Sequence, residues 1–539
     1  MDLKKSLDDV LTYFNGRAVH VTSVSLYGST VAGYAKPDSD VDVLVLAKSF
    51  REKVRYFYFE SGGVNYSALV SDLDETYNDA RSGSLGEFVV GRLLNPYIPL
   101  FGESVIREIE VEYKKRVISE EVAELYKSFQ DFVYALKVPL EYFLFSKLKK
   151  RYQIYPPALY SYAKTYSKEL QTRNLPMTVE GFRRAAQQLD FIDLEDGHVR
   201  IRKGSALPQM PAIDELYYFQ LAIKQYLFHS KSGKVPIEVY INEFVSKFKR
   251  SVDSREVNPY LKRPELLLSL DSDSRLIWGG VEKELQAERS YRIGGALNPL
   301  YGIKVVESGG KRYVIKEFKG KSEMKWYVLG IVGRPVKPFE MSPLRRMYNE
   351  YTGSVRLRGM GISVQNIIAV HIKKKILVKE YIEGKSLLDY IRENSQFEIA
   401  LKFVAAVAGV LRRIHDAGFA MGDSKPENFL VSGDRVFIVD LEQFRDAAGY
   451  DDKGWDVSEF VYYSLSFIKN DDLVKKFLES FREGYGEAEE IYRRAVSTKF
   501  LLPFLILSRP DELNHYRSLM QRTFLGGYNM QDDAGSIQQ

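Results

Sequence analysis

The 539-residue sequence contains no cysteine, which excludes disulfides, thiolate metal sites and cysteine nucleophiles. Its six histidines show no pairing at the spacing of metal ligands, so a zinc site is not expected. The N-terminal stretch MDLKKSLDDVLTYF has no apolar signal core, and the longest apolar runs are much shorter than a membrane span. These absences predict a cytoplasmic protein with no membrane partner.

The composition that remains is that of a globular protein, with 45% hydrophobic and 28% charged residues. The chain is too long for a single hydrophobic core, so several domains are expected. The net charge of +5 is mildly basic and does not by itself require a nucleic-acid partner.

The order of predicted elements divides the chain into three parts and indicates an α+β, multidomain fold. Residues 1–118 predict an amphipathic helix followed by strands, which form a small α/β domain. Residues 119–275 are mostly helical, and within them residues 177–203 have the helix, strand, turn, strand pattern of a winged helix. Residues 276–539 predict a β-rich lobe to about residue 382 and a helical lobe from about residue 383.

The strongest motif, GDSKPENFLVSGDRVFIVDLEQF, runs from residue 422 to residue 444. It places an Asp, a Lys, an Asn and a second Asp at spacings that suit phosphoryl transfer. Asp423 would position or deprotonate the attacking hydroxyl, and Lys425 would stabilise the moving phosphoryl group. Asn428 and Asp440 would bind Mg²⁺, which prefers oxygen ligands. A lone Asp or Asn in a loop is usually a turn residue, but the joint spacing is much more specific.

Residues further upstream supply the remaining parts of a nucleotide site. Lys316 lies in YVIKEF, a predicted strand, and would hold the α- and β-phosphates of ATP. Glu350, on the following predicted helix, would pair with Lys316. KEYIEGKSLLDYI resembles a hinge whose backbone would bond adenine near Glu380 to Ile382. Each of these charges alone is more simply explained as a solvated strand or helix residue.

The segment GDSKPENFLV resembles the catalytic loop of protein kinases, whose pattern is D-x-K-P-E-N, and IVDLEQF resembles their metal-binding D-F-G segment. Gly422 before the first Asp, and the short separation of the two metal ligands, are similar to RIO-like and other atypical kinases. The resemblance covers about residues 280–510. It implies a bilobal Ser/Thr kinase that uses ATP with Mg²⁺, or alternatively Mn²⁺. It also implies that Asp456 braces the backbone of the catalytic loop.

Several positions depart from the kinase pattern. DLE replaces D-F-G, Met421 stands where many such loops have His, and no A-P-E segment is apparent. The glycine-rich loop is weak, because Gly294, Gly295 and Gly302 lack the usual spacing. These departures leave the acceptor open between a protein hydroxyl, a small molecule and an RNA hydroxyl.

A second strong motif, LYGSTVAGYAKPDSDVDVLVL, lies near the N-terminus. Gly28 and Ser29 close a predicted strand and would present backbone N–H groups to a nucleoside triphosphate. Asp40 and Asp42 alternate along the next strand, so both carboxylates would face one side and hold the metals of nucleotidyl transfer. The motif resembles the minimal nucleotidyltransferases related to polymerase β, over about residues 18–118.

That family usually carries a third carboxylate on a later strand. Here Asn65 and Ser67 occupy the expected positions, and Asp72 and Asp74 come later in the sequence. With two carboxylates, metal binding is expected to be weaker. One possible role of this domain is therefore to bind a nucleotide or RNA without strong catalysis.

Basic residues in the middle part suggest an RNA partner, such as tRNA, through residues 147–203. A helix at residues 178–190 would bury Phe182, Ala186 and Leu189. Three sets of residues would supply the contacts to RNA. They are the polar helix residues Arg183, Arg184, Gln187 and Gln188, the wing residues His198, Arg200, Arg202 and Lys203, and the segment KLKKRYQIYPP at residues 147–157. A solvated helix face and a purely structural winged module explain the same charges more simply.

The sequence therefore predicts a transferase of the EC 2.7 class: an atypical Ser/Thr kinase that carries a nucleotidyltransferase-like domain. One alternative is a nucleotidyltransferase that acts on RNA or protein and uses the kinase half as an ATP sensor. The other is an RNA- or nucleotide-binding scaffold with two degenerate catalytic folds.

Overall fold

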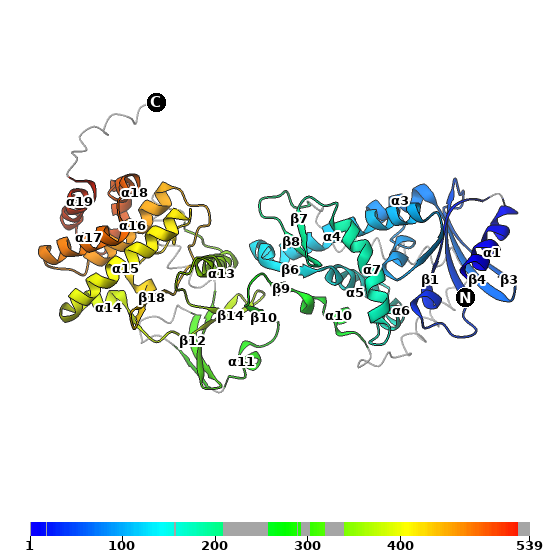
Figure 1. Ribbon diagram of the computed structural model, residues 1–539, viewed down its shortest axis with the longest axis horizontal. Coiled ribbons are helices and arrows are strands. Elements are labelled where there is room, and N and C mark those ends of the chain that lie inside the picture. The colour runs from blue at the N-terminus through cyan, green and yellow to red at the C-terminus, as the bar shows by residue number, and fades with distance from the viewer. Residues whose placement is uncertain are drawn as a thin grey trace, which may run out of the picture. The chain divides into compact units, whose positions relative to one another are not determined.

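The computed structural model describes residues 2–17, 19–155, 158–208, 257–287, 289–292, 302–318 and 339–526. These residues form two compact units of mixed helix and strand (Figure 1). The first unit comprises Met1–Ser128 and Val133–Asp271, and the second comprises Phe129–Phe132 and Ser272–Gln539. Among the described residues, no helix combines the length and the apolar character needed to cross a bilayer.

The first unit begins with a five-stranded sheet of order β3-β4-β2-β1-β5. β2 runs parallel to β4, whereas the other neighbouring strands are antiparallel. The predicted N-terminal helix is present, and its Val10 and Phe14 pack into the core of this sheet. The elements are α1 (Leu3–Asn15), β1 (His20–Tyr27), α2 (Gly28–Ala32), β2 (Val41–Lys48), β3 (Val54–Ser61), β4 (Val64–Asp72), α3 (Leu73–Ser82), η1 (Val90–Leu94) and β5 (Ile98–Phe101).

The rest of the first unit is helical, with a small sheet of order β7-β8-β6-β9. The predicted helix and hairpin are present, and Asp196 and Gly197 form the turn with φ of 47° and 76°, as a two-residue hairpin turn requires. The elements are α4 (Glu103–Phe129), η2 (Gln130–Ala135), β6 (Leu136–Pro139), α5 (Leu140–Ile154), α6 (Ala158–Thr165), α7 (Gln171–Ala186), β7 (Ile192–Glu195), β8 (His198–Ile201), α10 (Pro259–Lys262), η3 (Pro264–Leu267) and β9 (Ser269–Leu270).

The second unit opens with a six-stranded sheet of order β10-β14-β15-β13-β12-β11. Gly309 and Gly310 turn the predicted β12–β13 hairpin with positive φ. Gly302 begins β12, while Gly294 and Gly295 of the predicted glycine-rich loop lie outside the described residues. The elements are β10 (Arg275–Leu276), α11 (Val281–Glu284), β11 (Arg289–Arg292), β12 (Gly302–Ser308), β13 (Lys311–Glu317), α13 (Pro343–Gly359), β14 (Ile367–His371) and β15 (Ile376–Glu380).

The chain then becomes helical, with one large core in which α15, α16 and α17 share buried side chains such as Val404, Phe460 and Phe477. Both kinase-like motifs flank the hairpin β17–β18, which brings them together. The elements are β16 (Lys385–Ser386), α14 (Leu387–Arg392), η5 (Asn394–Gln396), α15 (Phe397–Asp416), η6 (Pro426–Asn428), β17 (Phe429–Ser432), β18 (Arg435–Ile438), α16 (Tyr450–Leu465), α17 (Asp471–Tyr485), α18 (Glu489–Ala495), η7 (Thr498–Ile506) and α19 (Pro510–Leu525).

Of the two predicted domain boundaries, the one at residue 275 lies near a break in the structure and the one at residue 118 does not. Residue 118 falls inside the continuous helix α4, and residue 275 lies close to the break between the two units after Asp271. The division into three parts stays a prediction, whereas the α+β, multidomain class is confirmed.

Candidate active sites

A buried lysine occupies the centre of a charged cluster in the second unit. Lys316 lies on β13 with 8% of its side chain exposed. Its Nζ lies 2.7 Å from Glu350 Oε2, 3.1 Å from Asp440 Oδ1 and 2.8 Å from Glu442 Oε1. Burial alone would lower the pKa of Lys316, but the surrounding carboxylates raise this pKa well above its usual value. The lysine is therefore charged. The predicted pair with Glu350 is present, and Asp440, predicted as a metal ligand, also lies within ion-pair distance of Lys316.

Glu442 belongs to this cluster although the sequence reasoning missed it. It is the third residue of DLE, where a D-F-G segment has glycine. Its Oε2 lies 2.8 Å from Arg346 Nη1, and its backbone N–H donates to Asp440 Oδ1 at 3.1 Å. Burial raises the pKa of Glu442, Lys316 lowers it, and Asp440 raises it further. The replacement of a glycine by an acid was the signal that could have identified this residue.

A second buried lysine, Lys379, was also missed. It lies on β15 with 3% of its side chain exposed, and its Nζ pairs with Glu350 Oε1. The same Nζ donates to the backbone C=O of Val439 at 2.6 Å, directly before Asp440. Lys379 therefore ties the helix that carries Glu350 to the start of the predicted metal-binding segment.

The predicted catalytic loop is held by α16. Asp456 accepts the backbone N–H groups of Met421 at 2.7 Å and Gly422 at 2.8 Å. This is the bracing position that the kinase resemblance implied. Gly422 has a φ of 76°, and a Cβ there would overlap the backbone C=O of Gln443. Glycine is therefore required at this point of the loop.

Asp423 and Lys425 lie together in this loop. Lys425 Nζ is 2.8 Å from Asp423 Oδ1 and 3.7 Å from Glu459 Oε1. Burial would lower the pKa of Lys425, but Asp423 and Glu459 raise it above its usual value, so the lysine is charged. Both side chains keep a small exposed fraction, 15% for Asp423 and 18% for Lys425. Each side chain therefore keeps part of its surface accessible to solvent.

Asn428 and Asp440 offer a donor set that fits a magnesium ion. Asn428 Nδ2 donates to the backbone C=O of Asp423 at 2.9 Å, which leaves Oδ1 for a cation. The N–H of Val439 donates to the C=O of Asn428 at 3.1 Å, so the two segments are adjacent. Burial would raise the pKa of Asp440, but Lys316 and Lys379 hold it below its usual value. An ionised carboxylate and a carboxamide oxygen suit a hard cation.

The predicted hinge is partly occupied by bonds within the protein. The N–H of Glu380 donates to the C=O of Asn366 at 2.9 Å, and its C=O accepts from Gln365 Nε2 at 2.7 Å. At Glu380 itself, this leaves a nucleotide base the second lone pair of the backbone carbonyl, and the N–H of Tyr381 donates to the C=O of Arg312 at 3.2 Å. Ile382 lies in the irregular segment between β15 and β16.

In the first unit, the predicted Gly-Ser turn lies against the second aspartate. Gly28 has a φ of 77°, and a Cβ there would overlap the Asp42 carboxylate, so glycine is required. Gly28 and Ser29 begin α2, and Asp42 lies opposite Tyr27 in the β1–β2 register. Burial raises the pKa of Asp42 to about 6. Asp40 is exposed and lies just before β2.

The neighbours of Asp42 differ from a three-carboxylate site. In the parallel β2–β4 register, Ser67 lies directly opposite Asp42, and the exposed Asn65 lies opposite Glu60 on β3. The cation Arg92, which the sequence reasoning missed, lowers the pKa of Asp42. Arg92 Nη2 donates to the Tyr56 hydroxyl at 2.6 Å. A neutral serine and an arginine therefore lie around Asp42.

The carboxylate of Asp72 is occupied by backbone hydrogen bonds away from Asp42. It caps α3 by accepting the N–H of Asp74 at 3.0 Å, and it also accepts the N–H of Phe50 at 2.8 Å. The later acid is thus a helix cap and is not available as a third ligand.

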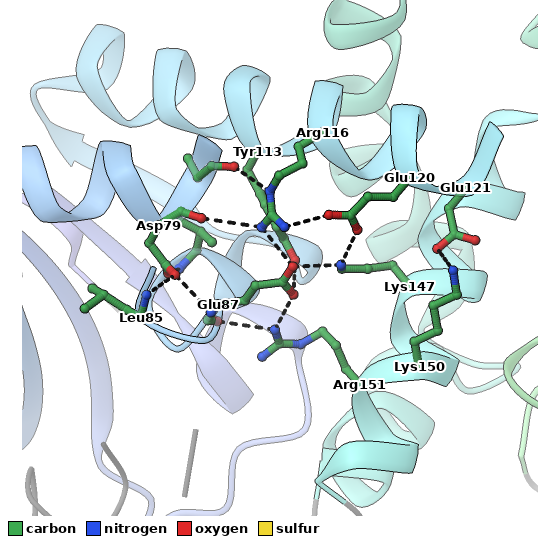
Figure 2. Close-up of polar contacts among 12 residues, drawn as sticks. Asp79, Leu85, Glu87, Tyr113, Arg116, Glu120, Glu121, Lys147, Lys150 and Arg151 are labelled. Atoms are coloured by element: carbon green, nitrogen blue, oxygen red, sulfur yellow. Dashed lines mark hydrogen bonds and ion pairs between the residues drawn. The ribbon is translucent and has the colours of Figure 1, made fainter. Parts of the chain in front are cut away.

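The prediction of a basic patch at residues 147–157 is wrong for Lys147, Lys150 and Arg151, because these cations lie in ion pairs with acids (Figure 2). Lys149 is 31% exposed and lies 4.0 Å from Glu265. Lys147 is 2% exposed, and its Nζ lies 2.7 Å from Glu87 Oε1 and 2.8 Å from Glu120 Oε2. Arg151 Nη1 lies 2.9 Å from Glu87 Oε2. Lys150 pairs with Glu121 at 2.8 Å. Since buried charges require partners, these cations are held by acids of the same unit and are not free for phosphates.

Four arginines elsewhere in the middle part are also paired with acids. Arg202 lies 2.6 Å from Asp193, and Arg200 lies 3.3 Å from Glu195, both within the β7–β8 hairpin. The exposed face of α7 behaves similarly, with Arg183 3.4 Å from Glu180 and Arg184 3.5 Å from Glu110. Phe182 and Ala186 are buried as predicted, and Leu189 is half-buried. RNA binding by this part stays a prediction.

Comparisons with known proteins fit this arrangement. Residues 3–126 match the nucleotidyltransferase domain family. The chain is 31% identical over 93 residues to the KEOPS complex subunit Bud32 of Pyrococcus abyssi, which covers 17% of this chain and 42% of that protein. It is 34% identical over 100 residues to a probable serine/threonine-protein kinase of Clostridium perfringens, covering 18% of this chain and 14% of that protein.

A longer match joins the chain to a probable bifunctional tRNA threonylcarbamoyladenosine biosynthesis protein of Thermoplasma volcanium. It is 25% identical over 275 residues and covers 48% of this chain and 50% of that protein. The chain thus spans half or less of the length of each of these three relatives. Together the matches confirm the two resemblances: a nucleotidyltransferase domain is joined to sequence similar to kinases.

Proposed function

We propose that the chain is an ATP- and Mg²⁺-dependent phosphotransferase whose second unit acts as an atypical Ser/Thr protein kinase. The observation that carries the proposal is the position of Lys316, whose single ammonium group lies within 3.1 Å of Glu350 on α13 and of Asp440 after β18. A lysine that meets a helix carboxylate and a metal-binding carboxylate is what a kinase nucleotide site requires. The similarity to a probable serine/threonine-protein kinase supports the same class.

Each residue of the site has a separate proposed role. Lys316, fixed by Glu350, would hold the α- and β-phosphates of ATP. Asn428 and Asp440 would hold Mg²⁺, which when bound supplies positive charge against the phosphates. Asp423 would accept the proton of the acceptor hydroxyl, and the charged Lys425 beside it would stabilise the transferred group. The acceptor oxygen bonds to the γ-phosphorus, the bond from that phosphorus to the bridging oxygen breaks, and ADP leaves.

The acceptor we propose is a protein Ser or Thr hydroxyl. Lys425 is the observation in its favour, because the D-x-K pattern that it completes is the one that the Ser/Thr-specific enzymes share. An RNA hydroxyl is the alternative, and the paired state of the basic residues between 147 and 203 gives it little support.

For the first unit we propose nucleotide binding with weak or no nucleotidyl transfer. Gly28 and Ser29 at the start of α2 would receive phosphate oxygens, and Asp42 with Asp40 would hold at most a weakly bound metal. The specific observation behind this proposal is Ser67 opposite Asp42, where a third carboxylate would lie, together with the nearby cation Arg92.

Labelled ATP tests these proposals. Label at the γ-phosphate should be transferred to the chain itself or to an added protein, and label at the α-phosphate should not. Asp440→Ala should lower the transfer by at least about a hundredfold, the usual cost of one electrostatic group in a transition state. Asp434→Ala, at an exposed aspartate of the same lobe, is the matched control and should retain full transfer.

Two outcomes would contradict the kinase proposal. Label retained only from the α-phosphate would make nucleotidyl transfer the main activity. Equal labelling of Asp440→Ala and the unmutated chain would remove Asp440 from the site.

A further inference from the structure

Four residues from the first half of the sequence belong to the second unit. These are Phe129–Phe132, between two segments of the first unit. Phe132 is completely buried, and its ring centroid lies 5.5 Å from that of Tyr348 and 5.5 Å from that of Tyr351. Both tyrosines are on α13, the helix that carries Glu350. The segment thus packs directly on the helix that supplies a carboxylate to Lys316.

Polar and aromatic contacts strengthen this packing. Arg345 Nε donates to Asp131 Oδ2 at 2.8 Å, and this contact raises the pKa of Arg345. Phe129 is buried with its ring centroid 6.0 Å from that of Trp278. The segment is therefore anchored at both ends within the second unit.

The two faces of α13 meet different partners. Residues three or four positions apart lie on the same face of a helix, so Arg346 and Glu350 share one face, and Tyr348 and Tyr351 share another. The first face contacts the metal-binding segment through the Arg346–Glu442 pair, and Glu350 reaches Lys316 from the same side. The second face packs on Phe132. Removing the support behind α13 would therefore allow Glu350 to move away from the lysine in front.

We infer that Phe129–Phe132 is a brace that fixes α13 and so positions Glu350 for Lys316. Phe132 and Asp131 are positioning residues, since they touch α13 and not the nucleotide site. The effect on phosphate transfer rests on the proposed kinase function, whereas the effect on the order of α13 does not. The brace makes the activity of the second unit depend on a segment that precedes it in the sequence.

The full-length chain and its variants test the brace by two readouts. The first is hydrogen exchange of the α13 amides, measured by mass spectrometry, and the second is transfer of γ-label from ATP. Phe132→Ala should accelerate α13 exchange about tenfold or more. It should also lower kcat by about tenfold to a hundredfold, because small misplacements of positioning groups have effects of that size. Phe143→Ala, a buried phenylalanine of the first unit, is the matched control and should leave both α13 exchange and kcat unchanged.

A charge exchange keeps the test valid if Phe132→Ala does not fold. Asp131→Arg and Arg345→Asp should each accelerate α13 exchange and lower kcat by about two- to fivefold, since the pair is partly exposed. The double variant should recover much of both losses. Unchanged α13 exchange in Phe132→Ala, or a double variant no better than the single ones, would overturn the brace. If the unmutated chain transfers no label, the kinase proposal fails, and the exchange measurements still decide whether the brace exists.

Discussion

Lys379 and Glu350 form a buried ion pair directly beside the pair that Lys316 makes with the other oxygen of the same carboxylate. One glutamate is thus held by two lysines from neighbouring strands, β13 and β15. The consequence is that Lys316 can turn to a phosphate without leaving Glu350 as an unpaired buried charge. Lys379 also fixes the carbonyl before Asp440.

Replacing Lys379 by Met should therefore disturb both the helix carboxylate and the metal-binding segment. We expect a loss of about 1–3 kcal/mol in the free energy of unfolding, because a buried carboxylate keeps only one of its two partners. The Mg²⁺ concentration for half-maximal transfer should rise, whereas Lys379→Arg should recover part of the activity. A titration of transfer rate against Mg²⁺ measures this effect.

The control for Lys379 is Lys402→Met, at an exposed lysine in the same unit. This variant should keep the unmutated magnesium dependence. If Lys379→Met also keeps the unmutated magnesium dependence and free energy of unfolding, the hydrogen bond from Lys379 to the Val439 carbonyl has no role in positioning Asp440.

In the proposed nucleotide site, Glu442 would compete with the phosphates of ATP for Lys316, because it forms an ion pair with that lysine at 2.8 Å. Glu442→Gln preserves the volume of the side chain and a hydrogen-bond acceptor for Arg346, but it removes the charge that attracts Lys316. The KM for ATP should fall by about two- to tenfold, since one opposing charge near the phosphates is removed. Steady-state kinetics with varied ATP give the value, and a KM that rises would show that Glu442 assists nucleotide binding.

Local patterns were sufficient to predict much of the fold and the proximity of several residues of the candidate site. The strands and hairpins follow from alternating or continuous apolar runs and from turns such as Asp196-Gly197, which the structure confirms. The spacing of Asp423, Lys425 and Asn428 fixes their proximity, because they belong to one loop.

The residues that were missed depend on contacts between distant segments. Lys379 and Glu442 meet at Glu350 and Lys316 only through the pairing of β13 with β15 and the return of the chain after β18. Arg92 reaches Asp42 through the fold of the first unit. No spacing rule within one segment predicts such meetings.

The error at residues 147–157 has a different cause. A run of lysines and arginines usually indicates an exposed surface, but α5 carries buried side chains over all its faces from Leu140 to Leu148. A helix that is apolar all round lies in a core, so a lysine within it must find a partner. That pattern was the available signal that Lys147 would be buried.

The network in Figure 2 predicts a strong stability effect at Glu87. Its carboxylate contacts Arg116 at 2.8 Å, Lys147 at 2.7 Å and Arg151 at 2.9 Å. Glu87→Gln would leave buried cations without this partner and should destabilise the first unit by about 3–5 kcal/mol in chemical denaturation. The exposed Glu195→Gln is the control, with an expected change within about 0.5 kcal/mol.

The pH dependence of this effect has a definite sign. Burial would raise the pKa of Glu87, but Lys147, Arg116 and Arg151 lower it below its ordinary value of 4.5. The stability from the ionised form is therefore present above pH 4.5 and is lost as the pH falls below that value. The free energy of unfolding of the unmutated chain should therefore approach that of Glu87→Gln as the pH falls below 4.5. A difference that is constant with pH would contradict the ion-pair account.

Asp42 should show the opposite pH dependence, because its pKa is raised in the folded state. The pKa rises from 3.8 to about 6, mainly through burial. Below pH 3.8 the carboxyl is protonated in both the folded and the unfolded chain, and its contribution to stability is fully present. As the pH rises from 3.8 toward 6, the Asp42 carboxyl ionises in the unfolded chain before it ionises in the folded chain. The free energy of unfolding therefore falls over this range, by up to about 3 kcal/mol.

Asp42→Asn removes the titrating group and should therefore make the first unit more stable than the unmutated chain at pH 8 but not at pH 3. Chemical denaturation of the full chain at the two pH values measures the difference. Asp40→Asn, at an exposed aspartate of the same motif, is the matched control and should change stability little at either pH. If Asp42→Asn is less stable at pH 8, the attraction of Arg92 for the ionised carboxylate outweighs the cost of its burial. The site would then hold Asp42 ready to bind a metal at neutral pH.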